Sequence, residues 1–234
     1  MKIEMIGIDF LREKIDFTNV SPQASMKEID EFCKNALAYK VKTIYVQPFF
    51  LQHVKDIIKN EIDIGTTGGF PFGNIPLQIK FDEIEYAAHN GARWIDICLN
   101  LSNVKSGYWG EVRNEVINLR DKSAKEGIGL KMIIETPFLT NKEIEEIIKI
   151  SETAKIEFIK TASGVRNKVT LDQLKFVKPL LKYCKIKVAG GVTKLEEVKD
   201  FLENGADKIG SSNGFEIIEE ALRNGDSTNS TCKI

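Results

Sequence analysis

The sequence predicts a single (β/α)8 barrel, the TIM-barrel fold, with an extra N-terminal helix. Its 234 residues suit one such barrel and are many for a single β-sandwich. Eight short β-rich runs alternate with amphipathic helical runs from end to end. Most β-rich runs are apolar on both faces, as parallel strands covered on both sides must be. Eight repeats of strict alternation favour a closed barrel over an open sheet.

The eight strand candidates follow one another without a linker or a low-complexity segment. They are IDFT from Ile15, TIYVQ from Thr43, DIGTTGGF from Asp63, WIDICLN from Trp94, LKMIIET from Leu130, FIKTAS from Phe158, IKVAGG from Ile186 and KIGSS from Lys208. Residues 1–234 are therefore expected to form one domain. Within it, residues 1–14 are expected to form the extra helix and residues 225–234 a polar tail.

The helical runs between these strands carry start and stop signals. Four begin with a capping box, in which a hydroxyl residue and a Glu or Gln three positions later satisfy free N–H groups. The pairs are Ser25 with Glu28, Thr140 with Glu143, Thr170 with Gln173 and Thr193 with Glu196. Two runs end in Asn-Gly-Ala, at residues 90–92 and 204–206, where glycine suits a left-handed helix end. NGARWI and NGADKI therefore predict the same helix-to-strand joint used twice.

Composition and charge exclude several classes of protein. Hydrophobic residues make up 42% and charged residues 29%, which is typical of a soluble globular protein. The formal net charge of −1 gives no global field to recruit nucleic acid or an anionic membrane, so neither is an expected partner. The N-terminus lacks a signal-peptide pattern, and no run approaches about 18 apolar residues. Four cysteines without a CxxC pair (Cys33, Cys98, Cys184 and Cys232) favour free thiols in a reducing compartment, and we expect a cytoplasmic protein.

Lysines inside otherwise apolar strands are the first candidates for catalysis, because barrel enzymes carry reactive groups at the C-terminal ends of strands. Alternation puts Lys160 on one strand face with Phe158 and Ala162, and Lys187 on one face of the next strand with Ala189. Two inward lysines on adjacent strands would each lower the pKa of the other, which is a way to activate a Schiff-base lysine. The alternative is that these lysines extend to the barrel mouth or a strand end.

Carboxylates in other strands supply natural partners for these lysines. Asp96 stands between two isoleucines and has no place in a core without a nearby ammonium group. A purely structural ion pair is the alternative reading of Asp96. Supporting positions are predicted for Asp16 and Thr18 in the first strand and for Lys131 in the fifth. Glu135 shares the strand face of Lys131 and could extend the same polar network.

Two glycine-rich turns predict an anion site. Gly190 and Gly191 follow the seventh predicted strand, and the run GSSNG at residues 210–214 follows the eighth. In this fold the loops after strands seven and eight gather backbone N–H groups into a phosphate site. Glycine lets the backbone approach the anion closely. Plain turn chemistry is the alternative for each run taken alone.

The motifs that the sequence lacks bear on cofactors. His53 and His89 are the two histidines, and both lie in helical runs where a surface or helix-packing role is expected. No cluster of His, Cys and carboxylate residues has the spacing of a metal site. Neither a GxGxxG run nor a Walker loop is present. We therefore expect no metal and no other cofactor.

Six segments resemble, in order, the deoxyribose-phosphate aldolases. They are GFPFGN, NGARWIDICLNLSNVKSGYW, LKMIIETPFLT, FIKTASG, KVAGGVTK and GADKIGSSNG. The resemblance spans about residues 15–222. FIKTASG matches the Schiff-base signature of that family, and KVAGGV supplies its second lysine.

The resemblance implies a class I aldolase that reversibly cleaves 2-deoxy-D-ribose 5-phosphate to D-glyceraldehyde 3-phosphate and acetaldehyde. It implies that Lys160 forms the imine, that Lys187 perturbs the pKa of Lys160, and that Asp96 with Lys187 relays protons through water. The phosphate would lie among Gly164, Gly190, Gly191, Gly210, Ser212 and Asn213. The imine is an electron sink that needs no metal. Barrels of this kind often dimerise, so a homo-oligomer such as a dimer is expected.

Several positions depart from the residues usual in that family. Phe17 stands in place of the His of IDHT, and the following LLKP reads NVSP at residues 19–22. Tyr45 and Gln47 replace the Cys and Asn of CVNP, and Asn213 replaces the second Ser of GTSSG. These changes are expected along one side of the pocket and at the phosphate, where they bear on substrate choice. Tyr45 also predicts better tolerance of acetaldehyde, because a cysteine at that position can be trapped by condensation products.

Three other functions stay open at this point. A related Schiff-base aldolase would act on another phosphorylated sugar, which a panel of sugar phosphates would reveal. A non-catalytic phosphate-binding barrel, a sensor or an assembly subunit, would have no reason to keep Asp96, Lys160 and Lys187 together. A phosphosugar isomerase would want a Glu/His base pair, which the two histidines disfavour.

Overall fold

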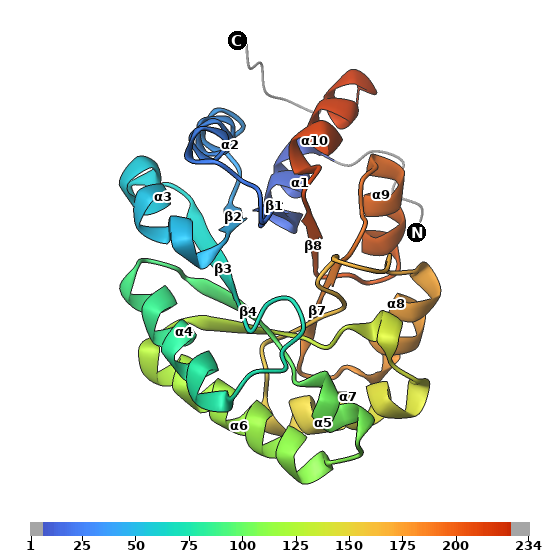
Figure 1. Cartoon of the computed structure of the whole chain (residues 1–234). Helices are drawn as coiled ribbons and strands as arrows, with labels where there is room; N and C mark the ends of the chain where they lie inside the picture. Colours follow the sequence, from blue (N-terminus) through green and yellow to red (C-terminus); the bar gives the residue numbers. More distant parts are fainter. Residues whose placement is uncertain (1–6, 226–234) are drawn as a thin grey trace.

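The computed structural model describes residues 7–225, which form a closed barrel of eight parallel strands inside a ring of helices (Figure 1). The strands pair in sequence order, and β8 pairs with β1 to close the barrel. They are β1 (Ile15–Asn19), β2 (Thr43–Val46), β3 (Asp63–Gly68), β4 (Trp94–Cys98), β5 (Gly129–Ile133), β6 (Phe158–Lys160), β7 (Lys185–Ala189) and β8 (Lys208–Ser211). The predicted fold class is confirmed.

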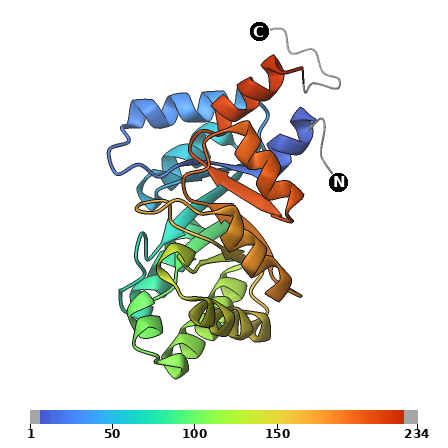
Figure 2. The same cartoon turned by 90° about the vertical axis from the view of Figure 1, so that its right-hand side faces the viewer.

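The helices pack around the outside of the strands, as the side view shows (Figure 2). They are α1 (Ile8–Lys14), α2 (Met26–Ala38), α3 (Leu51–Ile58), α4 (Leu77–His89), α5 (Leu101–Lys105), α6 (Trp109–Glu126), α7 (Asn141–Ala154), α8 (Leu171–Val177), α9 (Leu195–Glu203) and α10 (Gly214–Arg223). Helix α1 precedes β1, as predicted. The rest of the predicted N-terminal helix, residues 1–6, and the predicted tail beyond Gly225 lie outside the described residues.

Most of the predicted helix start signals are confirmed. The capping boxes that begin at Ser25, Thr140 and Thr170 are confirmed. The box predicted at Thr193 and Glu196 is wrong. Helix α9 begins one residue later, and the Glu197 carboxylate accepts hydrogen bonds from the N–H groups of Thr193 and Lys194 at 2.8 and 3.2 Å.

The two Asn-Gly-Ala joints are the same structure, as predicted. Gly91 and Gly205 have φ of +87° and +94°, which glycine adopts without strain. After each glycine the alanine N–H donates to a carbonyl five residues back, Ala92 to Ala87 and Ala206 to Phe201, at 3.0 Å in both. These two joints start β4 and β8 in the same way.

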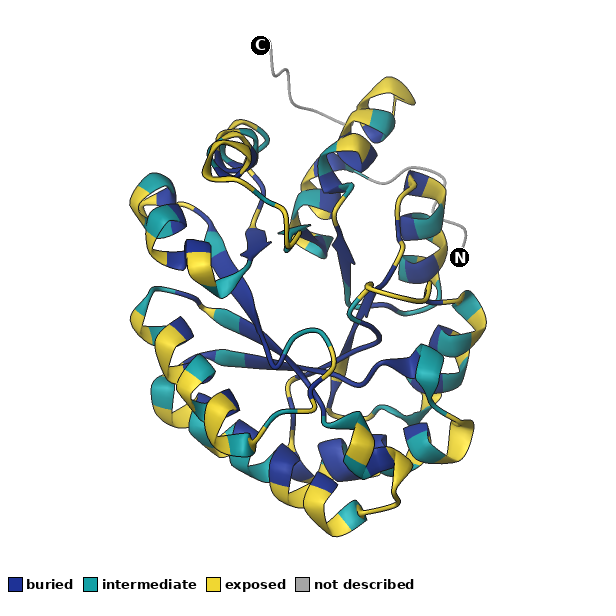
Figure 3. Cartoon of the chain, in the orientation of Figure 1, coloured by how far each residue is buried: buried dark blue, intermediate teal, exposed yellow. Residues whose placement is uncertain are grey.

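Apolar packing lies between the strands and the helices, and the inside of the barrel holds buried charged side chains beside aromatic rings. In Figure 3 most residues of the strands and of the inward faces of the helices are buried. Buried Ile159 and Ile186 belong to the apolar core, while their strand neighbours Lys160 and Lys187 are buried inside the barrel. Several strands end earlier than predicted, and β6 stops at Lys160 itself. The chain beyond each strand end is therefore free to build the loops at the barrel mouth.

Within residues 7–225 no helix is long and apolar enough to cross a membrane. Cys33, Cys98 and Cys184 are buried free thiols, in agreement with the prediction, and Cys232 lies outside the described residues.

Candidate active site

A buried chain of ion pairs occupies the barrel interior. Lys160 Nζ and Lys187 Nζ donate to the same oxygen, Asp96 Oδ2, at 2.8 and 2.9 Å. Lys187 Nζ also lies 2.7 Å from Asp16 Oδ2, to which Lys131 Nζ donates at 2.7 Å. The five residues are each 5% exposed or less. The predicted inward lysines therefore pair inside the barrel instead of extending to its surface.

Strand register explains why these side chains meet. Lys160 and Lys187 are direct partners on the parallel strands β6 and β7, and Asp96 and Lys131 are direct partners on β4 and β5. Barrel closure brings Asp16 on β1 across from them. The structure thus unites three predicted catalytic residues and two predicted supporting residues in one network.

The two carboxylates of the network are held in their ionised form. Burial alone would raise the pKa of Asp96, but the ammonium groups of Lys160 and Lys187 outweigh it and hold that pKa below its ordinary value. The same competition, with Lys131 and Lys187 as the main cations, holds the pKa of Asp16 well below its usual range. Both groups are therefore acceptors only and keep the surrounding lysines paired.

The lysines of the network differ from one another. Burial lowers the pKa of Lys187, but the carboxylates of Asp16 and Asp96 outweigh burial and raise it. The prediction that the paired lysines lower each other's pKa is therefore wrong for Lys187, because the sequence did not show that two carboxylates flank it. Burial lowers the pKa of Lys131 to about 8 against the opposing effect of Asp16.

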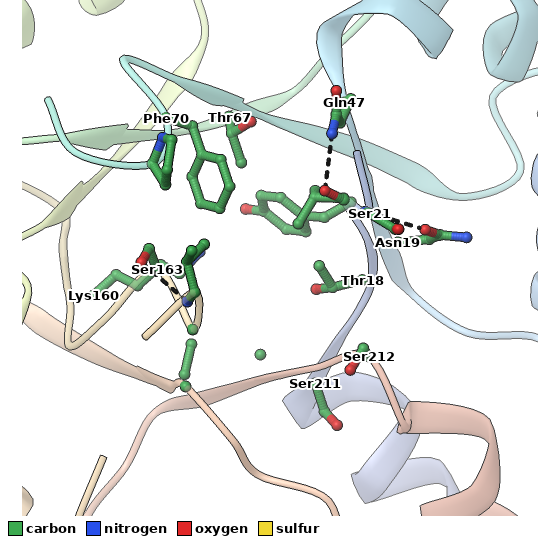
Figure 4. A pocket seen from close by; sticks show the side chains of 18 of the residues that line it. Thr18, Asn19, Ser21, Gln47, Thr67, Phe70, Lys160, Ser163, Ser211 and Ser212 are labelled. Carbon is green, nitrogen blue, oxygen red and sulfur yellow. Dashed lines mark hydrogen bonds between the residues drawn. The ribbon is translucent and has the colours of Figure 1, made fainter. Parts of the chain in front are cut away.

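A cavity of about 780 Å³ opens above this network at the C-terminal ends of the strands. Lys160 is the member of the network that lines it, beside Ser163 (Figure 4). The predicted supporting residue Thr18 also lines the cavity, as do the predicted binding residues Gly164, Gly190, Gly191, Gly210 and Ser212. Ser211 and Ser212 lie together in the same view. Lys160 and the predicted anion site thus share one cavity.

The glycine turns of the anion site have the conformations that only glycine adopts readily. Gly164, Gly190 and Gly191 have φ of +85°, +112° and +74°. A Cβ on Gly164 would lie 3.4 Å from Gly190 Cα, so the turns after β6 and β7 pack directly on each other. This close approach leaves backbone, and little side chain, at that wall of the cavity.

Asn213 is placed differently from its predicted neighbours. It does not line the cavity, and its backbone N–H donates to Ser211 Oγ at 3.0 Å. Ser211 Oγ in turn donates to the carbonyl of Val192 at 2.6 Å, which joins the loops after β7 and β8. Ser211 lines the cavity and was not singled out from the sequence, where it stood as one residue of a serine-rich turn.

Glu135 does not extend the ion-pair network, contrary to the prediction. It follows β5 in a left-handed conformation with φ of +55°, and its Oε2 accepts from the N–H of Ser163 at 2.7 Å. Burial raises the pKa of Glu135 against the hydrogen bonds from Ser163. The carboxylate therefore fixes the loop after Lys160. Alternation along β5 could not reveal this, because the strand ends before Glu135.

Other residues at the cavity carried no sequence signal of a site. Thr67, Phe70 and Glu83 line it, from β3, the loop after β3 and α4. Glu83 Oε2 accepts from the N–H of Gly69 at 2.7 Å and so holds that loop in place. The segment GFPFGN contributed to the family resemblance, but nothing in the sequence distinguished Glu83 from a solvated helix residue.

The residues that depart from the family pattern are not all at the pocket. Tyr45 and Gln47 line the cavity, and Gln47 Nε2 donates to the carbonyl of Val20 at 2.9 Å. Phe17 instead packs outside the strands against Phe215 of α10, with ring centroids 5.1 Å apart. The expectation that Phe17 lies at the pocket is therefore wrong, because its parity on β1 is opposite to that of Asp16.

His53 has the helix-packing role that the sequence predicted. His53 Nε2 lies 2.6 Å from Asp30 Oδ1 and joins α3 to α2. In the part of the chain that the structure describes, no group of three His, Cys, Asp or Glu side chains is arranged to hold a metal ion.

Known proteins resemble this chain in sequence as well as in fold. The sequence profile of the DeoC/LacD family aldolases matches residues 10–219. The chain belongs to the DeoC/LacD family of aldolases. The resemblance seen in its motifs is thereby confirmed, and the cavity around Lys160 is the candidate active site of a family aldolase.

Individual relatives in this family cover nearly the whole chain. The deoxyribose-phosphate aldolase of Staphylococcus epidermidis is 33% identical, over 91% of this chain and 97% of its own length. That of Thermococcus gammatolerans is 28% identical over 93% and 98%. The solved structure of QR15, an aldolase, is 31% identical with a TM-score of 0.87, covering 92% and 97%. A tetrameric deoxyribose phosphate aldolase from Aeropyrum pernix, at 23% identity and a TM-score of 0.86, shares the fold.

Proposed function

We propose that this chain is a class I aldolase that reversibly cleaves 2-deoxy-D-ribose 5-phosphate to D-glyceraldehyde 3-phosphate and acetaldehyde through an imine on Lys160. One observation carries the proposal. Lys160 is the member of the buried network that lines the cavity, and its Nζ shares Asp96 Oδ2 with Lys187. Family membership and the names of the relatives support the same substrate.

Imine formation begins when neutral Lys160 Nζ attacks the aldehyde carbon of the open-chain sugar. Water in the cavity takes the proton that Lys160 must lose, and Asp96 Oδ2, at 2.8 Å from Lys160 Nζ, holds the amine in place. Lys187 donates to the same oxygen and compensates its charge. Loss of water from the carbinolamine then leaves a protonated imine, which is the electron sink for bond cleavage.

Cleavage and product release need one proton to be moved twice. The C3 hydroxyl loses a proton, the C2–C3 bond breaks and the electron pair enters the imine to give an enamine. D-Glyceraldehyde 3-phosphate leaves as the first product. A proton returned to C2 regenerates the imine, and water then releases acetaldehyde. The Asp96–Lys187 pair, acting through water, is the acid/base group beside Lys160, and such a group typically contributes about 10²–10⁴-fold.

The phosphate is proposed to bind in the turns after β6, β7 and β8. Gly164, Gly190, Gly191, Gly210 and Ser212 line that side of the cavity. Backbone N–H groups in glycine turns next to a helix start form a common phosphate site in this fold. Binding energy at the phosphate can position the sugar over Lys160 without taking part in bond breaking. The proposal needs no metal, because the imine supplies the electron sink.

A small phosphorylated sugar is thus the proposed partner, and nucleic acid and membranes are not. We also propose a cytoplasmic location, in keeping with the buried free thiols. A homo-oligomer such as a dimer stays a prediction, and sedimentation velocity of the purified protein measures it.

Borohydride trapping tests the imine. The protein is incubated with 2-deoxyribose 5-phosphate and sodium borohydride, and peptides are mapped by mass spectrometry. We expect a reduced adduct on Lys160 that is absent in Lys160→Leu. Lys185→Leu, which removes an exposed lysine from β7, is the matched control and should keep the adduct. A folded protein without an adduct, or with the adduct on another lysine, would contradict the proposal.

A further inference from the structure

Tyr45 is a large side chain deep in the site. It lies on β2, in register with Thr18 on β1 and Gly65 on β3. The residue is 1% exposed, yet it lines the same cavity as Lys160. Its ring therefore forms part of the cavity floor.

Gly65 makes room for this ring. A Cβ at Gly65 would lie 2.4 Å from Tyr45 Cζ and 2.5 Å from Cε1, far inside van der Waals contact. Gly65 sits within the regular strand β3, so the glycine serves space and not an unusual backbone conformation. Tyr45 and Gly65 thus form one packing unit: the ring on β2 occupies the space that a side chain on β3 would need.

The ring is held beside the reactive lysine. Lys187 Nζ lies 3.5 Å from the ring centroid, a cation–π contact, and donates to the oxygen of Asp96 that also pairs with Lys160. Among residues 7–225, the Tyr45 hydroxyl and Asp96 Oδ1 are both buried without a hydrogen-bond partner. Burial, with Asp96 and Asp16 nearby, raises the pKa of Tyr45, so the phenol stays neutral. A rigid, neutral ring therefore bounds the floor of the site.

We propose that the Tyr45–Gly65 pair determines which carbonyl compound Lys160 accepts as the aldol donor and restricts it to two carbons. This inference rests on the aldolase function proposed above. The donor is bonded to Lys160 Nζ, so an additional carbon on it must find space next to the amine. The Tyr45 ring packs on Lys187, which pairs with the same Asp96 oxygen as the Lys160 amine. The ring therefore leaves less space beside that amine than a smaller side chain would. One methylene of misfit in an apolar pocket costs roughly 10–200-fold in kcat/KM.

The test compares two donors in the synthesis direction. D-Glyceraldehyde 3-phosphate is the acceptor, and the ratio of kcat/KM for acetaldehyde to that for propanal is measured. We expect the ratio in the unaltered protein to exceed about tenfold and to fall at least about tenfold in Tyr45→Ala. Tyr45→Phe keeps the ring without its hydroxyl and is the matched control, with a ratio close to that of the unaltered protein. Tyr45→Leu gives the same comparison if Tyr45→Ala does not fold.

The outcomes separate this inference from the proposed function. A folded Tyr45→Ala or Tyr45→Leu protein with an unchanged ratio would overturn the inference, as would a fall of the same size in Tyr45→Phe. Borohydride trapping of acetaldehyde on Lys160 is run on every protein. An absent adduct in the unaltered protein would mean that the aldolase proposal itself has failed. Adducts in all proteins with unchanged ratios would leave the aldolase proposal intact and reject only the donor restriction.

Discussion

Inside the barrel, buried lysines outnumber buried carboxylates. Three buried lysines, Lys131, Lys160 and Lys187, share the carboxylates of Asp16 and Asp96, and the partly exposed Lys208 lies 3.7 Å from Asp16 Oδ1. Loss of one proton from Lys160 would leave two buried cations facing two buried anions. In the proposed mechanism, Lys160 can therefore become the neutral nucleophile while Lys131 and Lys187 stay paired with the two carboxylates.

Asp16 is the residue on which the pairing of Lys131 and Lys187 most depends. Asp16→Asn keeps the shape but leaves both ammonium groups short of a charge partner in a buried site. Removal of one partner from a buried pair typically costs about 3–5 kcal/mol in the free energy of unfolding. We expect a loss of that size at pH 7, measured by urea denaturation.

The same variant has a defined pH dependence. The pKa of Asp16 in the folded protein is below its ordinary value of 3.8, so its stabilisation is complete above that value and is lost as pH falls below it. The stability gap between the unaltered protein and Asp16→Asn should therefore narrow below about pH 4. A gap that stays constant from pH 7 to pH 3 would show that Asp16 acts through shape and not charge.

Single residues were predictable where a charge broke an apolar strand. Lys160, Lys187 and Asp96 stood out for that reason, and strand alternation placed them on the inner face. The sequence did not show how Glu135 is used, because its role comes from a left-handed turn beyond β5. Tyr45 was visible as a departure, but its fit against Gly65 depends on the register of two strands.

At the scale of helices and strands, local signals such as helix caps could be predicted from the sequence, whereas contacts between strands could not. Capping boxes depend on residues three positions apart, and three of the four were read correctly. The fourth predicted capping box is wrong because either Glu196 or Glu197 could supply the capping carboxylate after Thr193. The local sequence does not show which of the two accepts the hydrogen bond. Register between strands is not a local property, so the partners of Lys187 could not be derived from its own strand.

Packing between β7 and β8 makes Gly210 a test of how Lys187 is positioned. A Cβ at Gly210 would lie 2.9 Å from Lys187 Cε and 3.0 Å from Ala189 Cβ. Lys187 cannot move away freely because two carboxylates hold its Nζ. We expect Gly210→Ala to lower kcat by roughly 10²-fold, the cost of displacing a catalytic group by about 1 Å. Steady-state assay of 2-deoxyribose 5-phosphate cleavage measures the effect.

Gly110→Ala is the control for that change. Gly110 lies in α6, and a Cβ there would meet nothing within 4 Å. Its activity should equal that of the unaltered protein, and its stability should be equal or up to about 1 kcal/mol higher. If Gly210→Ala and Gly110→Ala have equal kcat, the close packing of Gly210 on Lys187 does not position that lysine for catalysis.

At the scale of the whole molecule, barrel closure is what assembles the site. Asp16 lies on the first strand, and Lys187 lies 171 positions later on the seventh, yet closure leaves their charged atoms 2.7 Å apart. The alternation of β-rich and helical runs predicted this barrel, because strands and helices each have a hydrophobic period that can be recognised in the sequence. The pairing of distant charges followed only from three-dimensional closure, which places all eight strand ends around one cavity.

The proposed function places bond breaking and phosphate binding at different positions within that cavity. Lys160 ends β6, whereas Gly191 and Ser212 follow β7 and β8. If the phosphate binds at those turns, 2-deoxyribose without phosphate still reaches Lys160 but loses the positioning contacts. Two hydrogen bonds to a charged group contribute about 3 kcal/mol or more, so kcat/KM should fall by at least roughly 10²-fold.

Inorganic phosphate distinguishes this arrangement from a general loss of fit. It should compete with 2-deoxyribose 5-phosphate but should not compete with 2-deoxyribose, because only the first substrate needs the turn that contains Gly191. Gly191→Ala forces a φ of +74° on a residue with a side chain and places its Cβ 2.9 Å from Lys168 Cγ. That variant should lose the preference for the phosphorylated sugar and keep its activity on 2-deoxyribose. Equal inhibition of both substrates by phosphate would instead place the anion at Lys160 itself, and the separation of the two tasks would be rejected.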